Sequence, residues 1–244
     1  AAAPVVEVRD SIAAIPACDW NRLAGDNPFL RHEFLHALHE TGCAGADTGW
    51  APCYLILREQ GALAGAMPLY LKTHSYGEYV FDWAWADAYH RHGLRYYPKL
   101  LNAVPFTPVA GRRLLANTGE RRRLLLGAAL ELARESRASS LHCLFPPPGE
   151  AAEMQECGLM LRRGVQFHWR NQDYADFDAF LATLNHDKRK KIRQERRRVR
   201  DAGISFERFA GSAITDALWV FFNRCYRETY RQHHSTPYLN LDFF

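Results

Sequence analysis

Several features that would place this 244-residue chain in a membrane or an oxidising compartment are missing from its sequence. No apolar run approaches the roughly 18 residues that a membrane-spanning helix needs, and the longest, such as LLLGAAL, are short. The N-terminal stretch AAAPVVEVRD has neither the basic start nor the apolar core of a signal peptide. The six cysteines form no C-x-x-C pair, a pattern typical of reduced thiols. These absences predict a soluble cytoplasmic protein.

The sequence also lacks the short motifs of several enzyme classes. No G-x-S-x-G nucleophile elbow, Walker loop or zinc-finger spacing occurs. One H-E-x-x-H match is present at His32, Glu33 and His36, with His39 a turn further on. On a helix this spacing places two imidazoles on one face for zinc, but no downstream residue stands out as a third ligand. We therefore predict no metal site and rank a zinc peptidase third among the interpretations.

Basic residues, by contrast, are concentrated in one stretch. Between Asn185 and Arg200, nine Lys or Arg face two acidic residues, giving a net charge of +7, whereas the whole chain carries +4 and its remainder therefore −3. The narrow apolar stripe of this stretch predicts an exposed helix that ends near Gly203. Nine cations in sixteen positions exceed what solubility requires, although a solvated helix without a ligand is the alternative. The predicted phosphate-binding residues are Lys188, Arg189, Arg193 and Arg197.

The hydrophobic pattern predicts a mixed α/β chain. Strands are expected at 5–10, 104–109, 139–145, 160–171 and 204–209, with a hairpin at 51–75 that turns at residues 60 and 61. Helices are expected at 15–25, 27–42, 118–136, 150–158, 174–184, 185–200 and 212–233. An aromatic stretch at 76–100 is expected to be a loop. We predict a first domain over 1–172 and the start of a second, apparently truncated, domain over 173–244.

Several stretches resemble one protein family: SYGEYVFDWAWADAY, YYPKLLNAVPFTPVAGRRLL, LHCLF, KRKKIRQERRRV and TPYLNLDFF. They are similar to the FemAB-like predicted N-acyltransferases, which have tandem GNAT-type domains and are related to the Fem peptidyltransferases. The resemblance implies a GNAT-like mixed sheet flanked by helices and a bacterial enzyme that moves an acyl or aminoacyl group onto an amine. It also implies a link to cell-wall precursors, direct transfer without a prosthetic group, and acyl-CoA or aminoacyl-tRNA as co-substrate. The sequence departs from the pattern at ANTGERRR, which has one glycine where a coenzyme A loop has two.

The aromatic stretch supplies the candidate catalytic residues of such a transferase. An amine acceptor must lose a proton before it attacks, and tryptophans beside an Asp would raise the pKa of that carboxyl by desolvation. The predicted catalytic residues are Asp82 or Asp87 as base and Tyr89, Tyr96 or Tyr97 as acid. The predicted substrate-binding residues are Trp83, Trp85, His90 and Lys99. Two alternatives stay open: a loop whose aromatics fill the core and whose Asp residues cap turns, and a phosphate- or nucleic-acid-binding module, such as one for tRNA, without catalysis.

Overall fold

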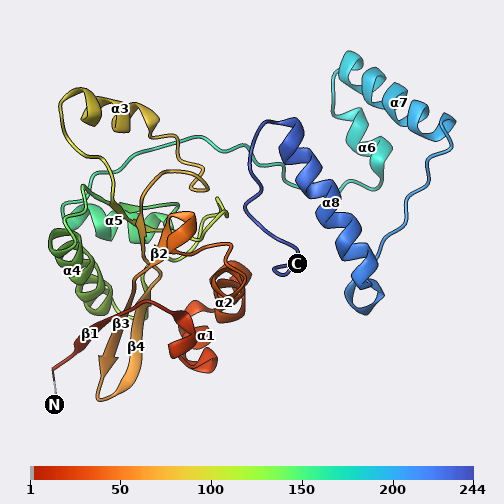
Figure 1. Cartoon of the computed structure of the whole chain (residues 1–244). Helices are drawn as coiled ribbons and strands as arrows, with labels where there is room; N and C mark the ends of the chain where they lie inside the picture. Colours follow the sequence, from red (N-terminus) through yellow and green to blue (C-terminus); the bar gives the residue numbers. More distant parts are fainter. Residues whose placement is uncertain (1–2) are drawn as a thin grey trace. The chain divides into compact units, whose positions relative to one another are not determined.

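The computed structural model describes residues 3–244 and confirms the mixed α/β fold (Figure 1). The strands are β1 (Val5–Arg9), β2 (Trp50–Pro52), β3 (Tyr54–Glu59), β4 (Ala62–Met67), β5 (Tyr70–Lys72), β6 (Lys99–Asn102), β7 (Leu115–Ala116) and β8 (Leu141–Cys143). The helices are α1 (Ala17–Ala24), α2 (His32–Glu40), α3 (Trp83–Arg91), α4 (Gly119–Glu135), α5 (Pro148–Glu156), α6 (Phe177–Ala182), α7 (His186–Asp201) and α8 (Asp216–Gln232).

The chain divides into two compact units. The first unit comprises the residues up to Leu161 together with Trp219–Phe244, and the second unit comprises Arg162–Leu218. The prediction of two tandem domains that meet at residues 172 and 173 is a different division of the chain, and it stays a prediction.

Two four-stranded sheets lie in the first unit. One has the order β1-β3-β4-β7 with antiparallel neighbours, and the other has the order β2-β5-β6-β8, in which β6 and β8 run parallel. The predicted hairpin is confirmed as β3 and β4. Its turn residues Gln60 and Gly61 both have positive φ, at 50° and 81°, the geometry that two-residue hairpins favour. Strand β2 and strand β5 add a second pairing within the same predicted segment.

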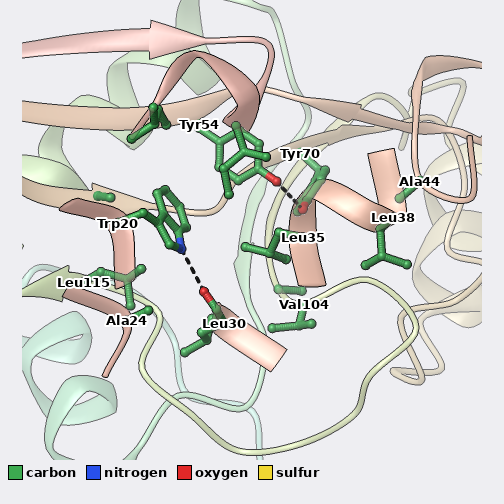
Figure 2. Packing of buried hydrophobic residues seen from close by; sticks show 14 of the residues in the cluster. Trp20, Ala24, Leu30, Leu35, Leu38, Ala44, Tyr54, Tyr70, Val104 and Leu115 are labelled. Carbon is green, nitrogen blue, oxygen red and sulfur yellow. Dashed lines mark hydrogen bonds between the residues drawn. The ribbon is translucent and has the colours of Figure 1, made fainter. Parts of the chain in front are cut away.

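Both faces of strand β3 are buried, because its side chains alternate between two hydrophobic clusters. Tyr54 and Ile56 join the cluster that contains Trp20 of α1 and Leu35 of α2. Leu55 and Leu57 join the other cluster, which contains the inward face of α4. Figure 2 shows the first cluster, in which the Trp20 indole donates to the Leu30 carbonyl at 2.8 Å. Helices therefore cover the β1-β3-β4-β7 sheet on both sides.

The single helix predicted at 27–42 is wrong, because the segment breaks at Arg31. Asn27 caps a short 3₁₀ helix over Pro28–Leu30, Arg31 is extended, and α2 begins at His32. The break has a tertiary cause. The Leu30 carbonyl accepts from Trp20, and the His32 amide donates to the Asn21 side chain at 2.8 Å. This carbonyl and this amide therefore have tertiary partners in place of the hydrogen bonds of a continuous helix.

Three predicted strands are also absent from the described residues. At 104–109 the chain turns, with Phe106 at φ 59° and prolines on either side of it that cannot donate to a ladder. The segments at 160–171 and 204–209 join neither sheet, although both carry the alternating apolar pattern of a strand. The pattern fixes which side chains share a face, but a strand forms only where a second strand completes its hydrogen bonds.

Candidate active site

Two buried lysines face each other across the second sheet. Strands β5 and β6 pair antiparallel with Lys72 directly opposite Lys99, and both side chains are fully buried. Like charges in direct cross-strand positions destabilise a sheet, and a buried charge without a partner costs far more. The fold therefore has to supply counter-charges at this place.

The Lys99 ammonium receives those counter-charges from the segment that links β5 to α3. Its Nζ donates to Glu78 Oε2 at 2.9 Å, to Asp82 Oδ2 at 2.5 Å and to Ser75 Oγ at 2.8 Å. Both carboxylate side chains are almost completely buried. Three donors on one ammonium are matched by three acceptors, so Lys99 is fully satisfied.

Two adjacent tyrosines complete the network. The Tyr96 hydroxyl donates to Asp82 Oδ2 at 2.7 Å, and the Tyr97 hydroxyl shares a hydrogen bond of 2.8 Å with Ser75. Burial, followed by the Asp82 carboxylate, raises the pKa of Tyr96, and burial likewise raises the pKa of Tyr97. Both phenols are therefore protonated donors near neutral pH. We call Lys72, Ser75, Glu78, Asp82, Tyr96, Tyr97 and Lys99 the lysine–carboxylate cluster.

Lys72 is the poorly satisfied member of this cluster. Its Nζ lies 3.8 Å from the centroid of the Trp50 ring and makes a long hydrogen bond of 3.4 Å to the Tyr76 carbonyl. Burial lowers the pKa of Lys72 to about 7; the Glu78 charge opposes this shift, and the Lys99 charge adds to it. The amine is thus close to half-deprotonated at neutral pH.

The pKa values of the two carboxylates are shifted in opposite directions. Burial raises the pKa of Glu78, against the opposing charge of Lys99. Burial would also raise the pKa of Asp82, but the hydrogen bonds from Lys99, Tyr96 and Ser75 outweigh it, and the pKa is lowered. Within residues 3–244, Glu78 Oε1 and Asp82 Oδ1 are both buried without a hydrogen-bond partner. The cluster therefore presents two unused acceptors beside a saturated ammonium.

The lowered pKa of Asp82 corrects the expectation that neighbouring tryptophans raise it. Trp83 and Trp85 point outward and are 45% and 54% exposed, so they do not desolvate the carboxyl. Asp82 also precedes the first turn of α3 without capping it, since its side chain turns to Lys99 instead. The aromatic stretch, expected to be a loop, contains this nine-residue helix.

Comparison with known proteins identifies the family. Residues 11–244 match the FemAB-like family, described as peptidoglycan biosynthesis/recognition. The chain belongs to the FemAB-like family. Among solved structures, it is similar to the ribosomal-protein-alanine N-acetyltransferase from Brucella melitensis biovar Abortus 2308, with a TM-score of 0.39 and 13% identity over 70% of this chain and 100% of that one. A search of curated proteins found no match. Among the described residues, no helix combines the length and apolar character needed to cross a bilayer.

The predicted site residues of this FemAB-like chain fall into two groups. The structure brings Asp82, Tyr96, Tyr97 and Lys99 together in the cluster, and the Tyr89 ring packs against Tyr96 with centroids 5.1 Å apart. The others lie along exposed positions of α3. Asp87 pairs there with Arg91 at 3.1 Å, and the remaining three are Trp83, Trp85 and His90. Their predicted roles stay predictions.

Three members of the cluster were missed at the level of sequence: Lys72, Ser75 and Glu78. The sequence does contain a signal for the two buried lysines. Lys72 and Lys99 each occupy an inward position of a short apolar strand, YLK and KLLN respectively. A charged residue at such a position has to be paired or functional. No local pattern, however, shows that Glu78 and Lys99 meet across 21 residues of chain.

The basic stretch of this FemAB-like chain forms the predicted helix α7 in the second unit. Lys188 and Arg197 are exposed, with no ion pair among residues 3–244. Arg189 is half-buried, and Arg193 pairs with Asp178 of α6 at 3.1 Å. The four predicted phosphate-binding residues therefore do not share one free face, and their role stays a prediction.

The H-E-x-x-H residues have partners that belong to the fold. His32 Nε2 lies 3.0 Å from the Ile12 carbonyl, and Glu33 accepts from Asn21 at 2.9 Å and pairs with Arg31. The rings of His32 and His36 are 5.6 Å apart. Within residues 3–244, no group of three or more His, Cys, Asp or Glu side chains is arranged to hold a metal ion.

Proposed function

We propose that this protein transfers an acyl or aminoacyl group from an activated donor to an amine of a peptidoglycan precursor, and that the lysine–carboxylate cluster receives the amine. Membership of a family described by peptidoglycan biosynthesis/recognition supports the class of reaction. The observation that carries the assignment of the site is the pair of unpartnered buried oxygens, Glu78 Oε1 and Asp82 Oδ1. An ammonium or amine supplies the N–H donors that these two oxygens lack.

The two carboxylates suit different tasks in this reaction. An acceptor amine enters as an ammonium and must give up a proton before its lone pair attacks the acyl carbon. Glu78 is the better base, because burial raises its pKa, whereas the pKa of Asp82 is lowered, so Asp82 stays ionised and orients the amine. Lys99 holds both carboxylates in place. The leaving group of the donor departs as a thiolate or a ribose alkoxide and needs a proton in return, and Tyr97 is a protonated donor at the cluster.

Glu78 and Asp82 belong to the segment between β5 and α3 and are both buried, so an amine reaches them only if this segment moves. Tyr79 in this segment has φ 58°, a left-handed conformation that costs a non-glycine residue of the order of 1–3 kcal/mol. Gly77 has φ 80°, and a Cβ there would come within 2.6 Å of the Phe106 ring. Strain of this kind is often found at segments that change conformation around a ligand.

The test is a transfer assay with the Glu78→Gln variant. The protein is incubated with acetyl-CoA or a charged tRNA pool and a peptidoglycan stem peptide that has a free side-chain amine, and the peptide mass is followed. Removal of a general base lowers the rate by about 10²–10⁴-fold. Glu131→Gln makes the same chemical change on the exposed surface of α4, where Glu131 pairs with Arg134, and should leave the rate unchanged.

Two results would contradict the proposal. If the Glu78→Gln variant transfers to the peptide at the parent rate, Glu78 is not the general base. No transfer from either donor class, by a protein that is folded by circular dichroism, would remove the proposed reaction.

A further inference from the structure

The second unit contains an open hollow of about 460 Å³ at the start of α6. Its lining residues are Trp169, Tyr174, Asp176, Phe177 and Phe180. The Trp169 ring stacks on Tyr174 with centroids 6.4 Å apart and meets Phe180 edge-on at 6.1 Å. Pockets for small ligands span roughly 300–1,000 Å³, so the hollow has the size for one flat ring system. Four aromatic rings around it offer stacking surfaces.

A row of arginines lies beside this hollow. Arg189, Arg193, Arg196 and Arg200 follow one another at three- and four-residue steps, so they share one side of α7. That side faces α6, because Arg193 pairs with Asp178 and the Arg196 guanidinium lies 4.2 Å from the centroid of Phe177. Exposed ion pairs are weak, so Arg193 can exchange Asp178 for a stronger anion. Planar guanidinium groups bind phosphate through two parallel hydrogen bonds.

We propose that the second unit binds an adenosine phosphate, with the base in the aromatic hollow and the phosphate on this arginine row. Single-stranded nucleic acids are commonly bound by aromatic rings that stack on the bases beside a positively charged surface that contacts the phosphates. Asp176 favours a base with an exocyclic amine, since one carboxylate oxygen accepts from the Ala179 amide at 2.7 Å and the other is left for such a donor.

The inference deepens the proposed function and rests on it for the identity of the donor. Coenzyme A carries a phosphorylated adenosine, and a charged tRNA ends in an adenosine that is linked through phosphate. Both donor classes thus present the chemistry that this hollow recognises. Binding to the hollow is nevertheless measurable without any transfer, so its failure is separable from failure of the reaction at Glu78.

The experiment is a calorimetric titration of the whole chain with adenosine 3′,5′-bisphosphate, with adenosine and inorganic pyrophosphate as partial ligands. We expect the bisphosphate to bind more tightly than either. Trp169→Ala should weaken binding at least about fivefold, which is the lower end for one stacked base. Phe167→Ala removes a 95% exposed ring from the same segment outside the hollow and should have no effect. Arg196→Gln should weaken binding, whereas Arg198→Gln, on the other side of α7, should not.

Two further ligands distinguish the sources of the adenosine. Tighter binding of coenzyme A than of the bisphosphate assigns an acyl-CoA donor. Tighter binding of a short RNA that ends in CCA, with a log–log salt slope of about −0.7 per phosphate, assigns a tRNA donor. Pyrophosphate that binds as tightly as the bisphosphate, or binding that Trp169→Ala leaves unchanged, overturns the base site. No binding of the bisphosphate overturns the whole inference.

Discussion

At the scale of single residues, the two opposed lysines are both buried but differ in the partners of their amino groups. Lys99 has two carboxylates and a hydroxyl around its ammonium, and Lys72 has a carbonyl at 3.4 Å and the face of Trp50. Desolvation therefore dominates the pKa of Lys72, although the Glu78 charge opposes it. A lysine that is half-deprotonated at neutral pH next to unused carboxylate oxygens is more typical of a functional site than of a sheet interior.

The first prediction at this scale concerns pH and Lys72. Its pKa is about 7 in the folded protein and about 10.5 in the unfolded chain, so between these values the unfolded chain holds more protons. The contribution of Lys72 to the free energy of unfolding must then rise with pH from about 7 upward and stay constant below. Lys72→Met is similar in shape and carries no charge. The melting temperature of this variant should exceed that of the parent at pH 6, and the excess should be much smaller at pH 8.5.

Melting curves of the parent and the Lys72→Met variant between pH 6 and 8.5 check this prediction. The range stays below the pH at which buried thiols and phenols titrate. Glu78 and Lys99 face Lys72, and loss of the Lys72 charge raises the pKa of Glu78, so the same curves with Glu78→Gln in both proteins separate the two groups. A melting-temperature difference that is equal at both ends of the range would show that Lys72 is fully charged in the folded state.

Four cluster residues were selected from the sequence because they lie in one short stretch that is rich in aromatic and ionisable side chains. They are Asp82, Tyr96, Tyr97 and Lys99. The direction of the Asp82 pKa was not predictable, because its partner Lys99 lies 17 residues away and is brought near by strand pairing. The sequence neighbours Trp83 and Trp85, which suggested the opposite direction, point to solvent.

At the scale of elements, helices were predicted more reliably than strands because their end signals are local. The side chains of Thr118, Asp176 and Asn185 each accept a hydrogen bond from the amide three residues on, within the first turn of the helix that each precedes. Strands were predicted at 160–171 and 204–209 from their apolar patterns, yet no strand forms in either described segment. Strand formation depends on a partner that the pattern itself does not name.

The prediction at this scale concerns the cap of α4. Thr118→Ala removes the acceptor for the Arg121 amide and should lower the free energy of unfolding by about 1 kcal/mol. Thr118→Ser keeps the hydroxyl and should stay close to the parent. Urea unfolding of the three proteins measures the difference. Equal losses in the alanine and serine variants would mean that the Thr118 methyl group, not its hydroxyl, supports the helix.

At the scale of the whole molecule, the last residues of the chain belong to the first unit. Asn240 donates to the Thr41 carbonyl at 2.6 Å, the Phe243 ring lies 5.8 Å from Phe34, and Tyr238 stacks on Phe106 at 4.8 Å. The first unit is therefore built from two stretches of chain, with the whole of the second unit inserted between them.

This arrangement predicts that the first unit survives cleavage of the insertion. Arg170 and Arg208 lie in exposed segments outside helices and sheets, so trypsin should cut there early. The fragments 1–170 and 209–244 should then leave a sizing column together, because the contacts of Tyr238 and Phe243 do not depend on the peptide bonds that were cut. Phe243→Ala removes one of those ring contacts and should promote separation, whereas Phe206→Ala, at an 86% exposed side chain, should not. Parent fragments that separate at once would show that residues 219–244 hold to the first unit only through the intact chain.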